Sequence, residues 1–312
     1  MQISIILLRQ LIMFFIMIIM GYMLVKSKLL KSEDSKVLSV TLIYLVLPCV
    51  IVNAFQITIT KRVLQGITAA FIAAVAIHLF FILFIWVGGK LWNMNEIEKA
   101  VVMYSNAGNM IIPIVGALLG QEWVLYSSAY IAVQLIFMWT HGSSLLDDRG
   151  SFQLRKIVTN INIIAIVIGI ILFFTGIKLP LIVTDTMSSV GDLLAPMSMF
   201  TTGMIIAGVD LKQALRRKRI YFIDALRLLI TPVIILLLIY VSGIAGRISD
   251  GNKILLITFL AVLTPSSSTI TQMAQIYNKD SEYAGILNVT STIACIITMP
   301  VLVWIYCCLF PF

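Results

Sequence analysis

The feature that most constrains this chain is a succession of long apolar runs separated by short polar loops. Hydrophobic residues make up 60% of its 312 residues and charged residues 12%, whereas soluble domains contain about 45–50% and about 25%. A soluble fold of this length cannot bury so much apolar surface, but a bilayer solvates it. Because the runs are long and continuous, they predict an all-α integral membrane protein rather than a barrel.

The apolar runs predict ten transmembrane helices at about 20–25 residues per span. In chain order, helices 1 to 10 are expected at residues 4–25, 36–56, 63–87, 97–119, 123–146, 157–176, 181–209, 219–243, 253–277 and 281–309. The first run is interpreted as a retained helix and not as a signal peptide, because basic residues follow it rather than precede it.

Loop charges predict the orientation of these helices. The loops that follow the odd-numbered helices carry fifteen Lys and Arg residues, namely Lys26, Lys28, Lys31, Lys36, Lys90, Lys99, Arg149, Arg155, Lys156, Lys212, Arg216, Arg217, Lys218, Arg219 and Lys279. The opposite loops carry five, Lys61, Arg62, Lys178, Arg247 and Lys253. The positive-inside rule therefore places residues 146–156 in the cytoplasm and both termini outside a cell membrane. The net charge of +8 is interpreted as this orientation signal and not as a nucleic-acid-binding surface.

The polar loop divides the chain into two equal sets of helices. Residues 1–146 and 157–312 each hold five predicted helices, and residues 147–156 link them. An odd number of helices per half makes the two halves insert in opposite directions, which is the arrangement of an inverted repeat.

Prolines support this repeat. Helix 2 contains Pro48 and helix 7 contains Pro196, while helix 4 contains Pro113 and helix 9 contains Pro265. Interruptions at matching places in two halves are the best sequence indication of a transporter site. We therefore expect helices 4 and 9 to be broken at their prolines and to cross each other.

Helix 4 has the first of two polar segments at mid-span depth, YSNAGNMIIP. Pro113 removes a backbone donor and disturbs the turn that begins at Asn109, and Gly108 adds backbone freedom. The side chains of Asn106 and Asn109 can each donate and accept hydrogen bonds. They are candidates for binding a solute, with interhelical hydrogen bonding as the alternative.

Helix 9 has the second polar segment, LTPSSSTITQ, around Pro265. A half-helix is expected to begin at residues 266–268, and its free N–H groups favour an anion. Serine hydroxyls that bond back to their own helix are the alternative for each serine taken singly. The candidate substrate-binding residues of the two segments are Asn106, Asn109, Ser266, Ser267, Ser268 and Gln272.

Ionisable residues inside spans are further candidates. Asp192, His78 and His141 are candidates for proton or ion coupling, with packing as the alternative for the histidines. Asp224 and Arg227 are three residues apart on helix 8 and are expected to form a structural pair.

Other chemistry has no support in the sequence. No phosphate-binding loop, G-x-S-x-G or H-E-x-x-H motif is present, so we expect neither an enzyme nor a metal or cofactor site. The four cysteines lack metal-ligand spacing.

The order and spacing of several segments resemble the auxin efflux carrier family, which includes bacterial malate and malonate permease-like proteins and the plant PIN-FORMED carriers. The residues concerned span nearly the whole chain: Gly21-Tyr22, Leu47-Pro48, Asn106-x-Gly108 with Ile112-Pro113 and Gly120, Gly203-Met204 with Leu211, Pro265-Ser266 with Ala274-Gln275-x-Tyr277, and Pro300. The short central loop differs from the long loop of the plant carriers, so auxin itself is not implied.

The resemblance implies a carrier of small organic anions such as mono- or dicarboxylates. Helices 1, 2, 6 and 7 would form a scaffold and a homodimer interface, and the remaining helices would move as an elevator. Three alternatives remain open from the residues: a sodium-coupled symporter of the bile-acid-transporter type, a membrane sensor or scaffold, and a channel. The anion, the coupling ion (H⁺ or Na⁺) and the direction of flux are not fixed by the sequence.

Overall fold

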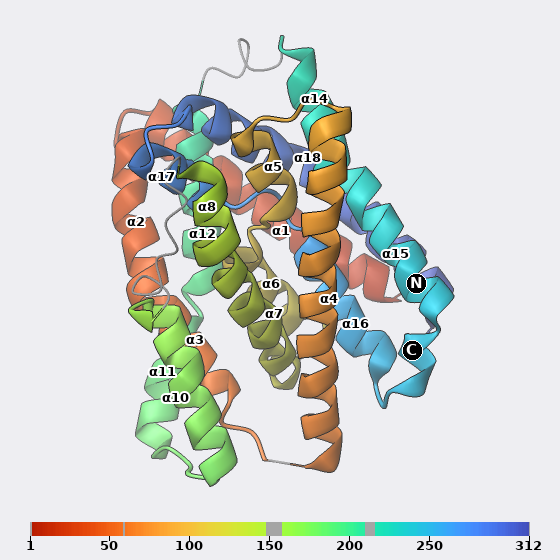
Figure 1. Ribbon diagram of the computed structural model, residues 1–312. Coiled ribbons are helices and arrows are strands. Elements are labelled where there is room, and N and C mark those ends of the chain that lie inside the picture. The colour runs from red at the N-terminus through yellow and green to blue at the C-terminus, as the bar shows by residue number, and fades with distance from the viewer. Residues whose placement is uncertain (1, 59, 148–157, 210–215, 312) are drawn as a thin grey trace.

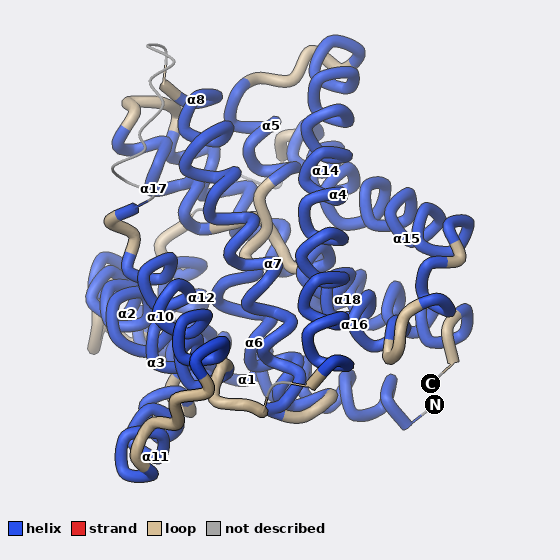
Figure 2. The backbone as a smooth tube through the Cα atoms, turned by 60° about the horizontal axis from the view of Figure 1, so that its bottom comes forward, coloured by secondary structure: helices blue, strands red, loops and turns tan. Residues whose placement is uncertain are grey.

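A computed structural model describes residues 2–58, 60–147, 158–209 and 216–311 of the chain. Every regular element among these residues is a helix (Figure 1). Figure 2 shows loop segments inside the bundle as well as at its ends. The start of α1 and the end of α18 lie near each other on one side of the molecule (Figure 1).

The helices follow the predicted apolar runs. In chain order they are α1 (Gln2–Lys26), α2 (Ser35–Thr41), α3 (Leu47–Ala54), α4 (Lys61–Leu91), α5 (Glu96–Met103), α6 (Ala107–Leu118), α7 (Val124–Phe137), α8 (Ser143–Leu146), α10 (Ile161–Thr175), α11 (Leu181–Gly191), α12 (Leu194–Ala207), α14 (Lys218–Ala225), α15 (Thr231–Ser242), α16 (Gly251–Leu263), α17 (Ser268–Ile276) and α18 (Ser281–Leu309).

Local signals fix several helix starts. Thr60 accepts the Val63 N–H at the start of α4, and Asp280 accepts the Tyr283 N–H at the start of α18. Asn95 caps α5, and Glu98 returns a hydrogen bond to the Asn95 N–H. These caps satisfy backbone donors that the first helical turn leaves free.

Three helix pairs are joined without interruption by π-helical segments. Leu42–Val46 joins α2 to α3, Met138–Gly142 joins α7 to α8, and Leu226–Ile230 joins α14 to α15. Proline follows two of these segments, as Pro48 and Pro232. Because proline cannot donate to the preceding turn, a wider turn before it accommodates the lost bond. The helix containing Pro48 is therefore continuous rather than broken.

The second predicted proline interruption is displaced. Asp192 and Leu193 separate α11 from α12, and Pro196 lies in the first turn of α12. Proline is compatible with the start of a helix because the donor it lacks would be unpaired there in any case. The break thus precedes Pro196 by one turn.

Six helical segments among the described residues have the length and composition to cross a membrane: Ser32–Ala54, Lys61–Leu91, Gln121–Leu146, Leu181–Ala207, Lys218–Ser242 and Ser281–Leu309. Four shorter apolar helices, Ile12–Lys26, Ala107–Leu118, Ile161–Thr175 and Gly251–Leu263, fall in the other predicted spans. The all-helical membrane class is therefore observed, whereas the count of ten spans and the inverted repeat stay predictions. Most of the linker 147–156 and residues 210–215 lie outside the described residues.

Small residues bring α1 and α12 into close contact. A Cβ on Gly203 would lie 2.0 Å from the Ile18 carbonyl oxygen, and one on Gly21 would lie 2.3 Å from that of Phe200. Such an approach allows dispersion contacts between backbones, which is how small residues stabilise helix pairs in lipid. Nearby, α3 packs against both α10 and α11.

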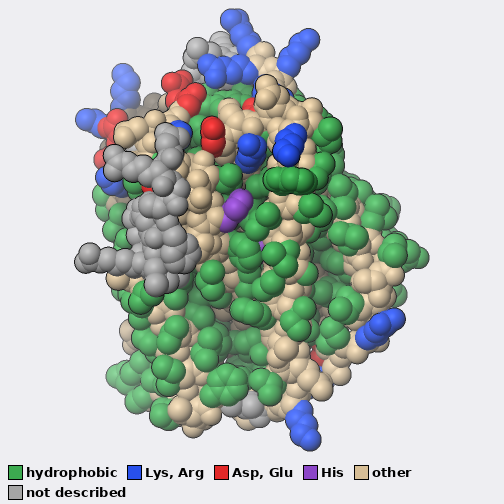
Figure 3. All heavy atoms as spheres, in the orientation of Figure 1, with side chains coloured by type: hydrophobic (Ala, Val, Ile, Leu, Met, Phe, Trp, Pro, Cys, Tyr) green, Lys and Arg blue, Asp and Glu red, His purple; other side chains and the backbone are tan. Residues whose placement is uncertain are grey.

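The surface separates into two kinds of region. On the face drawn in Figure 3, hydrophobic side chains cover most of the middle of the bundle, and Lys and Arg side chains gather at the end that carries the start of α14. An apolar belt with charges at the ends is the surface that a bilayer requires.

Candidate functional site

Two helices of the bundle are interrupted in its interior. The backbone leaves α5 at Tyr104 and resumes as α6 at Ala107, and it leaves α16 at Thr264 and resumes as α17 at Ser268. Tyr104 and Thr264 both have extended dihedral angles. The break in helix 9 therefore lies at Pro265, where the sequence places it.

The break in helix 4 lies elsewhere than predicted. Pro113 is inside α6, and the non-helical residues are Tyr104 to Asn106, well before it. Pro113 withdraws one donor from the turn of Asn109, but α6 continues through it. Long-range hydrogen bonds stabilise the non-helical backbone at Tyr104.

The two breaks cross and pair with each other. Ser105 and Ser266 form an isolated antiparallel β-bridge. The Asn106 N–H donates to the Pro265 carbonyl at 2.8 Å, and the Ser267 N–H donates to the Tyr104 carbonyl at 3.0 Å. Since an unpaired backbone group in a membrane costs several kcal/mol, each break supplies part of what the other lacks.

Side chains from two further helices complete the hydrogen bonding. Gln134 on α7 donates to the Ser105 carbonyl at 2.8 Å and accepts from the Ser105 hydroxyl at 2.6 Å. On α18, Asn288 donates to the Ser266 carbonyl at 2.6 Å, and Ser291 accepts the Ser266 N–H at 3.2 Å. Each break thus has one supporting helix that follows it in the chain.

These supporting residues carry little signal in the sequence. Asn288 is the first residue of an N-V-T glycosylation sequon inside the predicted helix 10, and Gln134 is a single amide in an apolar run. The signal that could have found them is a buried amide at the depth of a broken helix, because amides both donate and accept.

Arg227 contributes a buried cation to the same region. Its guanidinium donates to the carbonyl of Thr264 at 2.8 Å and to that of Val102 at 3.4 Å. The predicted pair with Asp224 is wrong: both side chains are described, and no ion pair joins them. Carbonyls at the helix breaks attract the guanidinium, because they lack helical partners.

The predicted binding residues divide by exposure. Ser266 and Ser267 are buried, and their hydroxyls bond Ser291 and the Thr269 N–H, respectively. Ser268 is half-buried in the first turn of α17, and Gln272, one turn later, is exposed. The serine cluster therefore separates into residues that hold the break and residues that remain accessible.

The start of α6 keeps accessible polar groups. Asn106 and Asn109 are half-buried, and the Asn109 amide donates to the Asn106 side-chain oxygen at 3.2 Å. A Cβ on Gly108 would meet only a Leu47 methyl group at 4.0 Å. The first turn of α6 is therefore loosely covered from the side of α3.

The candidate coupling residues lie in three different environments. The His78 imidazole is buried, donates to the Ala74 carbonyl at 2.8 Å and stacks on Phe137. His141 lies 2.9 Å from the Tyr104 hydroxyl and so adjoins the helix 4 break. Asp192 is exposed at the α11–α12 break, apart from these two.

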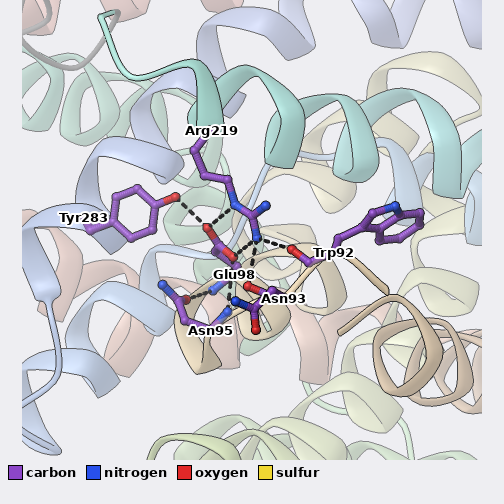
Figure 4. Close-up of polar contacts among 6 residues, drawn as sticks. All are labelled: Trp92, Asn93, Asn95, Glu98, Arg219 and Tyr283. Carbon is purple, nitrogen blue, oxygen red and sulfur yellow. Dashed lines mark hydrogen bonds and ion pairs between the residues drawn. The ribbon is translucent and has the colours of Figure 1, made fainter. Parts of the chain in front are cut away.

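A polar network near one end of the bundle joins three helices (Figure 4). Arg219 on α14 bonds both carboxylate oxygens of Glu98 on α5, at 2.8 and 2.6 Å. The Tyr283 hydroxyl on α18 donates to the same carboxylate at 2.9 Å. Glu98 is buried, so these donors replace the water that its charge would otherwise require.

Arg219 also ties down the loop before α5. Its Nη2 atom donates to the carbonyl oxygens of Trp92 and Asn93, at 2.9 and 3.2 Å. The network therefore fixes the N-terminal end of α5, whose C-terminal end leads into the helix 4 break. In the sequence Arg219 is recognisable only as a loop charge, because its carboxylate partner Glu98 is far away in the chain.

Two interrupted helices that cross inside a helical bundle are an arrangement found in membrane transporters. A family model described as "Membrane transport protein" matches residues 6–153 and 149–303. The chain belongs to this family, that of the auxin efflux carriers, and the predicted resemblance is confirmed. A comparison with curated proteins finds no match.

Proposed function

We propose that this transporter carries small organic anions, such as mono- or dicarboxylates, at the crossing of α5–α6 with α16–α17. The observation that carries the proposal is the antiparallel bridge between Ser105 and Ser266. Both new half-helices begin two residues after this bridge, at Ala107 and Ser268. Their N-termini are therefore brought to the same place in the bundle.

Helix N-termini supply the attraction for an anion. Each presents free N–H groups and a partial positive charge equivalent to about half an elementary charge, and carboxylates bind such ends. Asn106, Asn109, Ser268 and Gln272 are the predicted residues that stay at least partly exposed around these two N-termini. Their amides and hydroxyl can donate to carboxylate oxygens.

Helix packing supports an elevator movement. The close contact of α1 with α12 and the packing of α3 on α10 and α11 form one group of helices, which is our proposed scaffold and homodimer surface. The crossing helices pack with α4, α7 and α18 in a second group. Sliding of the second group along the first would expose the crossing to either side of the membrane in turn.

Counterflow in proteoliposomes tests this function. Purified protein is loaded with unlabelled malate, malonate or lactate, and uptake of the labelled anion is measured at two pH values, with and without sodium. Saturable counterflow of at least one carboxylate is expected, and a sodium or pH dependence would identify the coupling ion. Equal uptake by empty liposomes, or non-saturable flux, would refute a carrier of organic anions.

Two variants locate the site. Asn109→Ala and Pro265→Ala are expected to abolish counterflow while the protein remains folded in the membrane. Gln65→Leu is the matched control, because Gln65 is an exposed amide on α4 outside the crossing. Wild-type flux in both site variants would exclude the crossing as the binding place.

A further inference from the structure

Arg227 is a fully buried arginine inside the π-helical segment between α14 and α15. Its two terminal nitrogens donate to carbonyls of two different interrupted helices. Thr264 directly follows the last residue of α16, and Val102 lies in the last turn of α5. One guanidinium therefore bridges the carbonyl ends of both half-helices that lead into the crossing.

These carbonyl ends would otherwise oppose an anion. A helix C-terminus carries about half a negative elementary charge, of the same size as the positive charge at an N-terminus. At the crossing, the C-termini of α5 and α16 meet the N-termini of α6 and α17. Without compensation the four ends would nearly cancel, leaving little net field for an anion.

Arg227 and the N-terminus of α6 have different neighbouring helices. The segment carrying Arg227 contacts α5, and α16 contacts α4 and α15. In contrast, α6 contacts α1 and α12. Arg227 therefore lies on the side of the carbonyl ends, while the N-terminus of α6 faces the proposed scaffold.

Among the described residues, no carboxylate forms an ion pair with Arg227. The ring of Phe81 on α4 lies 5.7 Å from the guanidinium carbon. Asp224, one turn earlier on the same helix, makes no ion pair with it, although both side chains are described. The partial charges of the two carbonyls are thus the closest negative groups that the guanidinium bonds.

We propose that Arg227 is a positioning residue that makes the crossing electrostatically one-sided, so that the site binds anions and prefers two negative charges to one. The inference rests on the proposed function and adds to it the group that sets the charge preference. Arg227 does not contact the anion in this scheme. It neutralises the helix ends that would repel the anion.

The test compares charge with structure at one position. Arg227→Gln and Arg227→Met remove the charge, Met without leaving a buried amide, and Arg227→Lys keeps the charge but loses the two-pronged geometry. Asp224→Asn is the matched control on the same helix. Counterflow KM is measured for malonate and for lactate in each variant, together with Tm in detergent.

A buried unit charge within roughly 10 Å of a dianion changes the affinity for that dianion by about tenfold or more at an effective dielectric constant of about 20. Whichever neutral variant folds is expected to raise KM for malonate by about that factor and KM for lactate clearly less. Arg227→Lys is expected to keep the wild-type malonate-to-lactate ratio despite a lower Tm. Asp224→Asn is expected to keep this ratio as well.

Two different failures are distinguishable. If the wild-type protein shows no counterflow of any carboxylate, the proposed function is wrong. If the wild type transports and the ratio is unchanged in a neutral variant, or is lost equally in Arg227→Lys, then Arg227 has only a structural role and the inference is overturned.

Discussion

The backbone N–H of Asn106 donates to the carbonyl oxygen of Pro265 at 2.8 Å, so a residue of each broken helix completes the backbone of the other. The two segments are far apart in the chain, yet neither can remain extended in the bundle alone. Their stability is therefore mutual, and changes to their supporting side chains should affect both.

Removing the Gln134 side chain should destabilise the crossing. Gln134→Leu leaves the buried carbonyl of Ser105 without its amide donor, and each such orphaned group costs about 1–3 kcal/mol. We expect a lower Tm in detergent and loss of counterflow. Gln65→Leu, at an exposed position, should leave both unchanged, and equal Tm values for the two variants would contradict the assigned support.

A methyl group at Gly203 should separate α1 from α12. The added Cβ would lie 2.0 Å from the Ile18 carbonyl oxygen, so the helices must move apart, at a cost of about 1–3 kcal/mol. The expected result for Gly203→Ala is a lower Tm. Gly246→Ala is the control, because a Cβ there meets nothing within 4 Å. Unchanged stability of Gly203→Ala would show that the contact is not tight.

Replacing Glu98 should destabilise the N-terminal end of α5. Glu98→Gln removes the charge that Arg219 and Tyr283 bind, and hydrogen bonds to charged groups contribute about 1.5–3 kcal/mol. We expect a lower Tm and faster limited proteolysis of the loop before α5. Glu96→Gln on the exposed side of the same turn is the comparison, and it should behave nearly as wild type.

Stability should fall in acid through Asp250. Its hydrogen bond to the Arg62 guanidinium lowers the pKa of the carboxyl group, aided by the charges of Arg62 and Lys253. A lowered folded-state pKa means that this stabilisation is complete above the unfolded value of about 3.9 and is lost as pH falls through the folded value. Tm measured between pH 6 and pH 3 should fall less steeply in Asp250→Asn, and less steeply in high salt. Parallel curves for the two proteins would contradict the linkage.

The predicted orientation can be tested on one helix. Lys61 and Lys90 lie at opposite ends of α4. In a cysteine-free background, Lys61→Cys should react with an impermeant maleimide in intact cells, and Lys90→Cys only after permeabilisation. The reverse pattern would invert the assignment of both termini to the outside.

Sequence patterns located helices better than they located the crossing. Apolar runs predict the helices because burial in lipid depends on composition. Pro265 marks the break in helix 9 because it is one of the non-helical residues there. The prediction of the other break from Pro113 was wrong, since a proline inside a membrane helix is compatible with either a break or a continuous helix. The choice depends on Ser266 and Gln134, partners that no local pattern specifies.

The lack of a local pattern also explains why the partner of Arg227 was predicted wrongly. Sequence spacing pairs it with Asp224 on the same helix, but the guanidinium instead reaches the carbonyls of Thr264 and Val102. Backbone carbonyls freed by a break leave no mark in a sequence. Only the three-dimensional arrangement shows that the helix ends, and not a carboxylate, are its partners.

The π-helical segment that carries Arg227 has a consequence for how this helix can vary. A π turn contains one residue more than an α turn, so it takes up this residue within one wide turn, and α14 and α15 keep nearly the same phase around the common axis. Deleting one residue from α14 or α15 instead, where no wide turn is present, would rotate one part against the other by about 100°. Either the guanidinium would leave the crossing or the end of the helix bound to Glu98 would turn away. A one-residue change in length is therefore expected to be tolerated at the wide turn, whereas elsewhere in this helix it would displace either Arg227 or Arg219 from its partners.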